Sequence, residues 1–360
     1  MSLDSYRSKR DAAKTPEPMP EWDVPDVSVD HTGDEQAGRG ETFVVQEHHA
    51  TALHWDLRIE RDGVLVSWAV PKGIPLDPAR NHLAKQTEDH PKAYAEFAGD
   101  IPKGEYGGGT MSIWDSGTYE LQKWRSREVM LVLHGTKVDG RYVLFRTRDR
   151  DWMLHRMDPP PAGWSALPEG LRPMQPTNGS LPPDEQEWTF EVRWSGRRVL
   201  IAVDGGRLHV EDADGADITA GYPELRGLGL QLGSRPVLLD AELVVLDGAG
   251  RVDPAGLKAR GETVKPGRAL LRGKPVQLMI GDLLHREGES LLDQEYHRRR
   301  AALEELDLQG PNWQVPPTFP GEGAAVLEAA RTQGLAGIVA KKLDSSYRPG
   351  RRTRKWLVIS

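Results

Sequence analysis

The chain has 360 residues, of which 47 are Lys or Arg and 54 are Asp or Glu, so its formal net charge is −7. At roughly 150 residues per domain, this length predicts two domains. The acidic balance excludes a uniformly basic nucleic-acid-binding protein, so any contact with nucleic acid must come from local patches. The absence of cysteine excludes disulfides, thiolate zinc sites and cysteine nucleophiles. Without a long apolar run or a signal-peptide core, we expect a soluble, cytoplasmic protein.

Composition divides the chain into four parts. Residues 1–40 are polar, and Pro16, Pro18, Pro20 and Pro25 prevent a long helix, so we expect an N-terminal arm. Short strands separated by Gly or Asp predict a mostly β domain over residues 41–157. A Pro-rich stretch predicts a linker over 158–187, and mixed periodicity predicts an α+β domain over 188–360. In that domain we expect strands over 188–203 and 237–246, and helices over 294–305 and 322–333.

A strand pair near the start of the β domain carries the first group of chemically useful residues. Residues 53–60 alternate between apolar and polar, which is typical of a half-buried strand, and Asp62-Gly63 predicts a tight turn to a partner strand over 64–70. Because strand side chains alternate with a period of two, His54, Asp56 and Arg58 share one face. Trp55, Leu57 and Ile59 then bury the other face.

With His48 on the preceding strand, this face offers two imidazoles and one carboxylate. Such a set suits Mn²⁺, Zn²⁺ or Fe²⁺ and leaves positions open for water and substrate. Arg58, two residues beyond Asp56, can bind phosphate oxygens bidentately. The alternative is a set of solvated polar residues on an exposed sheet face.

Several separated motifs resemble the 3'-phosphoesterase domain of bacterial ligase D, the multifunctional end-joining ligase. They are Phe43-Val44-Val45-Gln46, His48, Leu53-His54, Asp56, Arg58, Ser67-Trp68-Ala69-Val70-Pro71-Lys72-Gly73, Glu88-Asp89-His90-Pro91 and Ile101-Pro102 with Gly104 and Tyr106-Gly107. The resemblance covers residues 5–157 and includes Lys9-Arg10-Asp11 and Thr15-Pro16-Glu17-Pro18 in the arm.

The resemblance implies a small β-barrel that uses manganese to remove a 3'-terminal ribonucleoside and then the remaining 3'-phosphate. It assigns the metal to His48, His54 and Asp56, and the phosphate to Arg58, His90 and Tyr94. It implies supporting roles for Lys72, Arg10, Asp11 and Glu17. His82 replaces an arginine that the family usually has, so we expect a weaker or pH-dependent phosphate contact there.

The second half resembles the nucleotidyltransferase domain of ATP-dependent DNA ligases over residues 186–360, with no OB-fold. The motifs are Glu191-Val192-Arg193-Trp194-Ser195-Gly196, Leu239-Asp240-Ala241-Glu242, Asp282-Leu283-Leu284, Gly337-Ile338-Val339-Ala340-Lys341, Ser346-Tyr347 with Pro349-Gly350, and Trp356. Where the family has a lysine nucleophile and an aspartate, this chain has Arg193 and Ser195. Arginine stays protonated and cannot attack the α-phosphate of ATP. Gly281, Ala336, Val358 and Ser360 replace the stacking aromatic, the glutamate and two lysines.

These departures predict a ligase-like domain that does not use ATP and serves as a scaffold, in which Glu191, Glu242 and Lys341 are retained. The resemblance implies a role in bacterial double-strand break repair on primer–template or broken duplex 3' ends, with Ku and separately encoded ligase or polymerase proteins as partners. Two alternatives stay open at this stage. One is a working ATP-dependent DNA ligase, against which Arg193 and Val358 argue. The other is a non-catalytic DNA-end-binding adaptor, against which the intact histidine–aspartate set argues.

Overall fold

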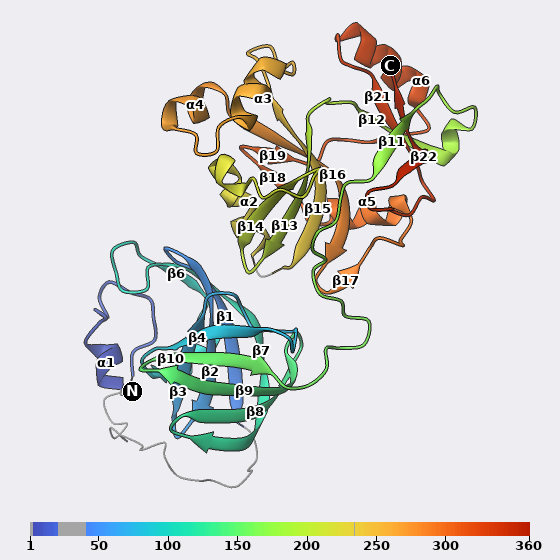
Figure 1. Cartoon of the computed structure of the whole chain (residues 1–360). Helices are drawn as coiled ribbons and strands as arrows, with labels where there is room; N and C mark the ends of the chain where they lie inside the picture. The colour runs from blue at the N-terminus through green and yellow to red at the C-terminus, as the bar shows by residue number, and fades with distance from the viewer. Residues whose placement is uncertain (1–2, 21–40, 234) are drawn as a thin grey trace. The chain divides into compact units, whose positions relative to one another are not determined.

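A computed structural model describes residues 3–20, 41–233 and 235–360. The chain forms two compact units, Met1–Ala162 and Gly163–Ser360 (Figure 1). The first is a β-barrel with a short helix, and the second is an α+β unit with two sheets, as the sequence predicted. No helix among the described residues is long and apolar enough to cross a membrane.

Eight antiparallel strands close the barrel of the first unit. In ring order they are β1 (Thr42–His49), β2 (Leu53–Arg61), β3 (Val64–Val70), β4 (Asn81–Gln86), β10 (Asp151–Arg156), β9 (Asp139–Arg148), β8 (Glu128–Gly135) and β7 (Gly109–Arg125), and β7 pairs with β1. The predicted hairpin is present between β2 and β3, where Asp62 and Gly63 both have positive φ angles of 49° and 83°. Inside the barrel, the Trp68 ring lies 5.8 Å from that of Trp152.

A second layer covers the outer face of β1, β2 and β3. It consists of α1 (Leu3–Arg7), β5 (His90–Pro91), the 3₁₀ helix η1 (Lys92–Glu96) and β6 (Gly99–Ile101). Tyr6 and Tyr94 pack there with Leu65, so β2 is buried on both faces and the alternative of an exposed sheet face is wrong. Residues 3–20 of the predicted arm therefore pack against the barrel, while residues 21–40 lie outside the described residues.

The second unit contains two sheets. The five-stranded sheet has the order β11 (Gln175–Asn178), β22 (Arg352–Ile359), β21 (Ile338–Lys342), β12 (Trp188–Val192) and β20 (Phe319–Pro320). The seven-stranded sheet has the order β14 (Arg207–Asp212), β13 (Arg197–Asp204), β15 (Val237–Val245), β16 (Val276–Arg286), β19 (Trp313–Gln314) and β18 (Gln309–Gly310), with β17 (Glu289–Ser290) pairing with β16. The α-helices are α2 (Arg226–Leu232), α3 (Pro254–Gly261), α4 (Arg268–Gly273), α5 (Tyr296–Glu304) and α6 (Gly323–Thr332); the 3₁₀ helices are η2 (Glu185–Glu187), η3 (Thr219–Gly221) and η4 (Pro223–Leu225).

Two expectations for the second half need correction. The single strand expected over 188–203 is broken into β12 and β13, because Ser195 adopts a positive φ of 55° and the chain passes from one sheet to the other. The linker expected over 158–187 is shorter, since β11 pairs in parallel with β22 and residues from Gly163 onward belong to the second unit. The helices expected over 294–305 and 322–333 are present as α5 and α6.

Candidate functional site

A cavity lies between the outer face of β1, β2 and β3 and the layer that covers it. His48, His54, Asp56, Arg58, His90 and Tyr94 all line it, and so do Arg10 and Glu17 from the N-terminal segment. The structure thus brings together eight of the residues that the sequence selected for the phosphoesterase.

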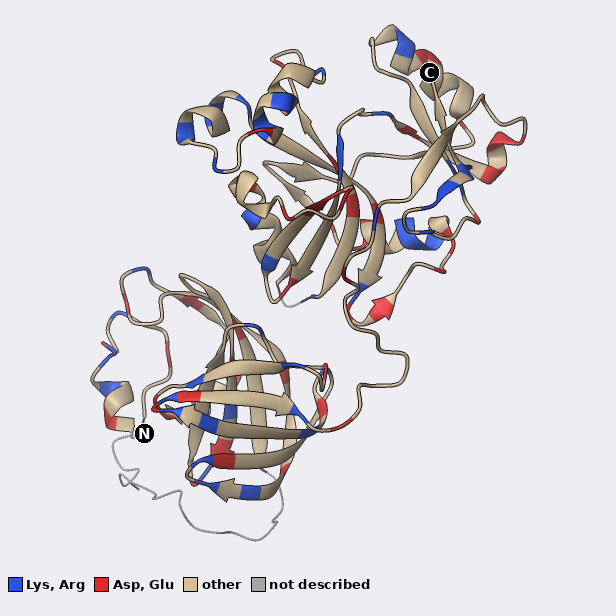
Figure 2. Ribbon diagram, viewed as in Figure 1, with Lys and Arg blue, Asp and Glu red and all other residues tan. Residues whose placement is uncertain are grey.

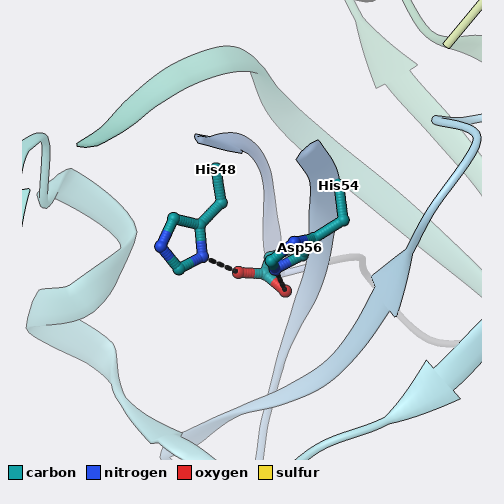
Figure 3. Close-up of side chains that lie close together, drawn as sticks. All are labelled: His48, His54 and Asp56. Carbon is teal, nitrogen blue, oxygen red and sulfur yellow. Dashed lines mark ion pairs between the residues drawn. The ribbon is translucent and has the colours of Figure 1, made fainter. Parts of the chain in front are cut away.

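The possible metal ligands come from two neighbouring strands. His48 on β1 lies directly opposite His54 on β2, and Asp56 is two residues further along the same face. One ligand atom from each of the three lies within 4.8 Å of the others. His48 Nδ1 is 3.8 Å from Asp56 Oδ2, and His54 Nε2 is 3.7 Å from Asp56 Oδ1 (Figure 3). Two imidazole nitrogens and a carboxylate facing one point fit a divalent transition metal.

Hydrogen bonds orient both imidazoles. His48 Nε2 donates to the carbonyl of Gly107 at 2.8 Å, and His54 Nδ1 donates to the carbonyl of Ala52 at 3.0 Å. In each neutral ring the other nitrogen therefore carries no hydrogen, and this nitrogen faces Asp56. A metal ligand requires this tautomer. Burial is the main influence on the pKa of His48 and lowers it, so that this imidazole is neutral and able to ligate.

Arg58 is held by three side chains. Its Nε donates to Gln46 at 2.6 Å, Nη1 to Ser67 at 3.0 Å and Nη2 to Asp56 at 2.9 Å. A guanidinium has five N–H groups, so one on each terminal nitrogen is left for a phosphate oxygen. Sequence reasoning did not assign a role to Gln46 or Ser67. Both residues belong to the motifs that carry the family resemblance, and both lie on the same strand faces as His48 and Arg58.

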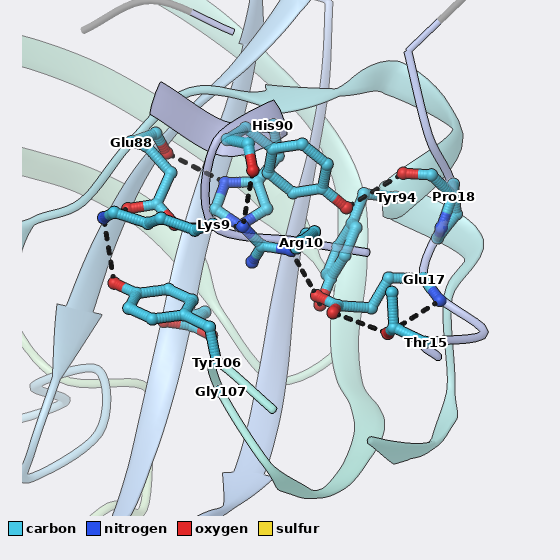
Figure 4. Close-up of polar contacts among 12 residues, drawn as sticks. Lys9, Arg10, Thr15, Glu17, Pro18, Glu88, His90, Tyr94, Tyr106 and Gly107 are labelled. Carbon is cyan, nitrogen blue, oxygen red and sulfur yellow. Dashed lines mark hydrogen bonds and ion pairs between the residues drawn. The ribbon is translucent and has the colours of Figure 1, made fainter. Parts of the chain in front are cut away.

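The N-terminal segment completes the cavity with a charged network (Figure 4). Arg10 Nε donates to Glu17 at 2.8 Å and Nη1 to Glu88 at 3.2 Å. Tyr94 donates its hydroxyl to Glu17 at 2.8 Å, and Lys9 Nζ lies 2.9 Å from Glu88. Because both carboxylates and Arg10 are almost fully buried, the network fixes the segment against the barrel.

A backbone contact orients the imidazole of His90. Its Nδ1 donates to the carbonyl of Glu88 at 2.8 Å. Burial, followed by the positive charges of Arg58 and Arg10, lowers its pKa well below the usual value. The ring is therefore neutral, and its Nε2 carries a lone pair.

Three residues selected from the sequence do not line this cavity. Lys72 is exposed. His82 donates from Nδ1 to the carbonyl of Gly73 at 2.7 Å, so this ring nitrogen is already used in a hydrogen bond within the protein. Asp11 is exposed, accepts from the amide of Ala13 and pairs with Lys14 at 3.2 Å.

A second cavity lies between the two sheets of the second unit. Among the ligase-like positions named from the sequence, Glu191, Arg193, Ser195, Glu242 and Lys341 line it. Ala336, by contrast, is exposed two residues before β21 and does not line it.

Contacts within the protein occupy the polar groups of this second cavity. Lys341 Nζ lies 2.8 Å from Glu191 Oε1 and 3.0 Å from the carbonyl of Gly281, and Tyr296 donates to Glu191 at 2.5 Å. A side chain at Gly281 would place its Cβ 3.3 Å from Lys341 Nζ. Glu242 accepts from the amide of Gly196 at 2.8 Å. Lys341 therefore takes part of the space beside Gly281.

Two family models match the chain in this order. Residues 46–146 match the DNA ligase D 3'-phosphoesterase domain, and residues 175–359 match the ATP dependent DNA ligase domain. The multifunctional non-homologous end joining protein LigD of Mycolicibacterium smegmatis is 42% identical over 99% of this chain and 45% of its own length. The protein of that name from Pseudomonas aeruginosa is 32% identical over 99% of this chain and 47% of its own. The chain spans less than half the length of these relatives.

Two solved structures are similar to parts of the chain. Mycobacterial DNA ligase D complexed with ATP and MES is 35% identical, with a TM-score of 0.47 over 53% of this chain and 60% of that chain. The ligase domain of Mycobacterium tuberculosis LigD is 36% identical, with a TM-score of 0.46 over 52% of this chain and 60% of that chain.

Proposed function

This chain belongs to the ATP-dependent DNA ligase family and has the LigD-like order of a 3'-phosphoesterase domain before a ligase domain, and from that premise we propose a function for each domain. The first domain is a metal-dependent phosphoesterase that removes a 3'-terminal ribonucleoside and then the 3'-phosphate, leaving a 3'-hydroxyl on DNA. The second domain is a ligase-like scaffold that does not react with ATP.

The observation that carries the first proposal is the facing of His48 Nδ1, His54 Nε2 and the Asp56 carboxylate around one point. Both imidazoles already have the tautomer that ligation requires. We propose Mn²⁺ as the ion. A divalent ion bound there would neutralise negative charge on the phosphoryl oxygens.

The remaining residues of the cavity bind and orient the phosphate. The two unused N–H groups of Arg58 stabilise charge on equatorial oxygens, and they are preorganised because Gln46 and Ser67 fix the guanidinium. His90 Nε2 accepts a proton or hydrogen bond from the incoming substrate. The arm residues Arg10 and Glu17 hold Tyr94 in place at the cavity wall.

The proposal of a ligase-inactive second domain rests on Arg193 and on the cavity around it. A guanidinium stays protonated at usable pH and offers no lone pair for attack on the α-phosphate. Glu191 and Lys341 already neutralise each other, and Gly281 presents no ring for adenine to stack on. This cavity therefore does not fit ATP as a reactant.

The setting that we propose is bacterial double-strand break repair by non-homologous end joining, in the cytoplasm, on broken or primer–template 3' ends. The partners that we propose are Ku and ligase or polymerase proteins, because joining processed ends requires a ligation step that the second domain is proposed not to perform.

The test uses a labelled primer–template that ends in a 3'-phosphate or in one ribonucleotide. With Mn²⁺ we expect conversion to a 3'-hydroxyl end, lost on chelation and in Asp56→Ala or His54→Ala. His134→Ala is the matched control, because His134 is an exposed barrel histidine that does not line the cavity. Full activity in a homogeneous Asp56→Ala protein would contradict the proposal.

A further inference from the structure

Five exposed arginines gather at two neighbouring hairpin tips of the barrel, in a chain whose formal net charge is −7. Arg125 ends β7 and Arg127 lies in the turn before β8; Arg146 and Arg148 are at the end of β9, and Arg150 lies in the turn before β10. Lys and Arg, blue in Figure 2, occur on the strands of the barrel and on their connections. The tips lie side by side, because β8 pairs with β9 and the amide of Arg146 donates to the carbonyl of Arg127 at 2.9 Å.

Nearby carboxylates only partly offset this charge. Glu128 pairs with Lys123 at 2.6 Å, and Asp151 lies across from Lys85 in the β4–β10 register. Asp149 is exposed at the turn itself. In the part of the chain that the structure describes, Arg127, Arg148 and Arg150 form no ion pair. Their guanidinium groups are therefore available to an external anion.

The cluster adjoins the rim of the phosphoesterase cavity. The amide of Gln86, the last residue of β4, donates to the carbonyl of Arg150 at 2.8 Å. The next residue, Thr87, lines the cavity and donates its amide to the carbonyl of Ser67, which is a partner of Arg58. Two residues therefore connect the cavity wall to the arginine tips.

We propose that the arginines at these tips bind the phosphate backbone of the polynucleotide whose 3' end occupies the cavity. Neighbouring strands are roughly 4.8 Å apart, so tips separated by two strands are about 10 Å apart. At about 3.4 Å of rise per phosphate on one strand, this distance spans about three phosphates. Arginine suits this role because its planar fork binds phosphate oxygens bidentately. The inference rests on the proposed function of the first domain and names where its substrate lies beyond the reacting end.

The experiment compares two 3'-phosphate substrates on the full-length chain with Mn²⁺. One is a dinucleotide, which is too short to extend from the cavity to the arginine tips. The other is a primer of about 16 nucleotides in a primer–template, which is long enough to reach them. The variant is Arg127→Gln/Arg148→Gln/Arg150→Gln. The control is Lys137→Gln/Arg141→Gln, which removes exposed cations at the opposite ends of β8 and β9.

For the triple variant we expect kcat/KM on the long substrate to fall roughly tenfold or more at low salt. The slope of log KM against log salt should become shallower by about 2.7, because three contacts to duplex DNA are lost at about 0.9 each. The dinucleotide should be cleaved as by the wild-type protein. Equal kcat/KM values on the long substrate would overturn the inference, and so would an equal loss on both substrates or an equal loss in the control. Failure of the proposed function itself would be distinct, because the wild-type protein would then cleave neither substrate.

Discussion

Arg58 donates from Nη2 to Oδ2 of Asp56 at 2.9 Å, and the two side chains are only 2% and 7% exposed. The carboxylate proposed as a metal ligand is thus oriented by the guanidinium proposed to bind phosphate. Since Gln46 and Ser67 occupy two other nitrogens of Arg58, neither group can turn without breaking buried hydrogen bonds. This pair therefore couples the proposed metal site to the proposed phosphate site.

We predict that Arg58→Lys lowers kcat/KM of the 3'-phosphatase by about 100-fold or more, although the charge is retained. An ammonium cannot keep the directed contacts to Gln46, Ser67 and Asp56 and still bind two phosphate oxygens. Steady-state kinetics on a 3'-phosphate primer measure the effect, with Arg141→Lys as a control at an exposed ion pair. Activity within a few-fold of wild type would show that the bidentate geometry is unimportant.

Metal binding should be visible without any turnover. We predict that Mn²⁺ raises the melting temperature of the wild-type protein, because an ion at 100 times its Kd adds about 2.7 kcal/mol to the stability of the folded state. Asp56→Asn should abolish most of this rise, since the neutral amide is a poor ligand. Asp139→Asn, at an exposed barrel aspartate, is the control. An equal rise in Asp56→Asn would place the metal elsewhere.

Local sequence pattern predicted the β2–β3 hairpin and the shared face of His54, Asp56 and Arg58, because both follow from the period of a strand and from a two-residue turn. It did not predict that the outer face is buried. That burial comes from Tyr6, Tyr94 and Glu17, which pack over β1–β3 from distant parts of the chain.

Long-range contacts also explain the other differences. No local pattern shows that Gln46 anchors Arg58 across the β1–β2 pair, or that Lys341 reaches Gly281 and Glu191 from another strand. The positive φ of Ser195 likewise reflects the passage between two sheets. For the candidate site, the resemblance supplied Arg10 and Glu17, which periodicity alone would have left in a solvated arm.

A lysine placed at position 193 should not produce adenylation of the chain. We predict that neither the wild-type protein nor Arg193→Lys becomes labelled with α-labelled ATP. In the variant an amine is present, but Gly281 still offers no stacking ring and Lys341 still neutralises Glu191. Gel autoradiography measures the label bound to each protein, and an active ATP-dependent ligase run in parallel is the positive control. Label on the wild-type chain would show that the second domain is a working ligase.

The Lys341–Glu191 pair should contribute to the stability of the second unit. We predict that Lys341→Met destabilises the protein by about 2–4 kcal/mol, because Glu191, whose side chain is 14% exposed, is then left in a largely enclosed site without its cation. Lys342→Met is the matched control. Lys342 is the next residue in the chain and pairs with Glu187 near the surface, where an ion pair contributes little to the free energy of unfolding. Urea unfolding of both variants gives the comparison. Similar midpoints for the two variants would contradict a structural role for the buried pair.

Acidification should destabilise the second unit through His285. Burial is the main influence on the pKa of this side chain and lowers it, while Nε2 donates to the carbonyl of Ser165 at 3.0 Å. Because the folded-state pKa lies below the unfolded value of about 6.5, the unfolded chain binds the extra proton first. Stability is therefore unaffected above pH 7 and decreases as the pH falls below about 6.5, until the lowered folded-state pKa is passed. Thermal melts across this range should show a smaller decrease in His285→Gln, which keeps a donor but does not titrate. An identical pH dependence of the two melting temperatures would mean that His285 is not the responsible group.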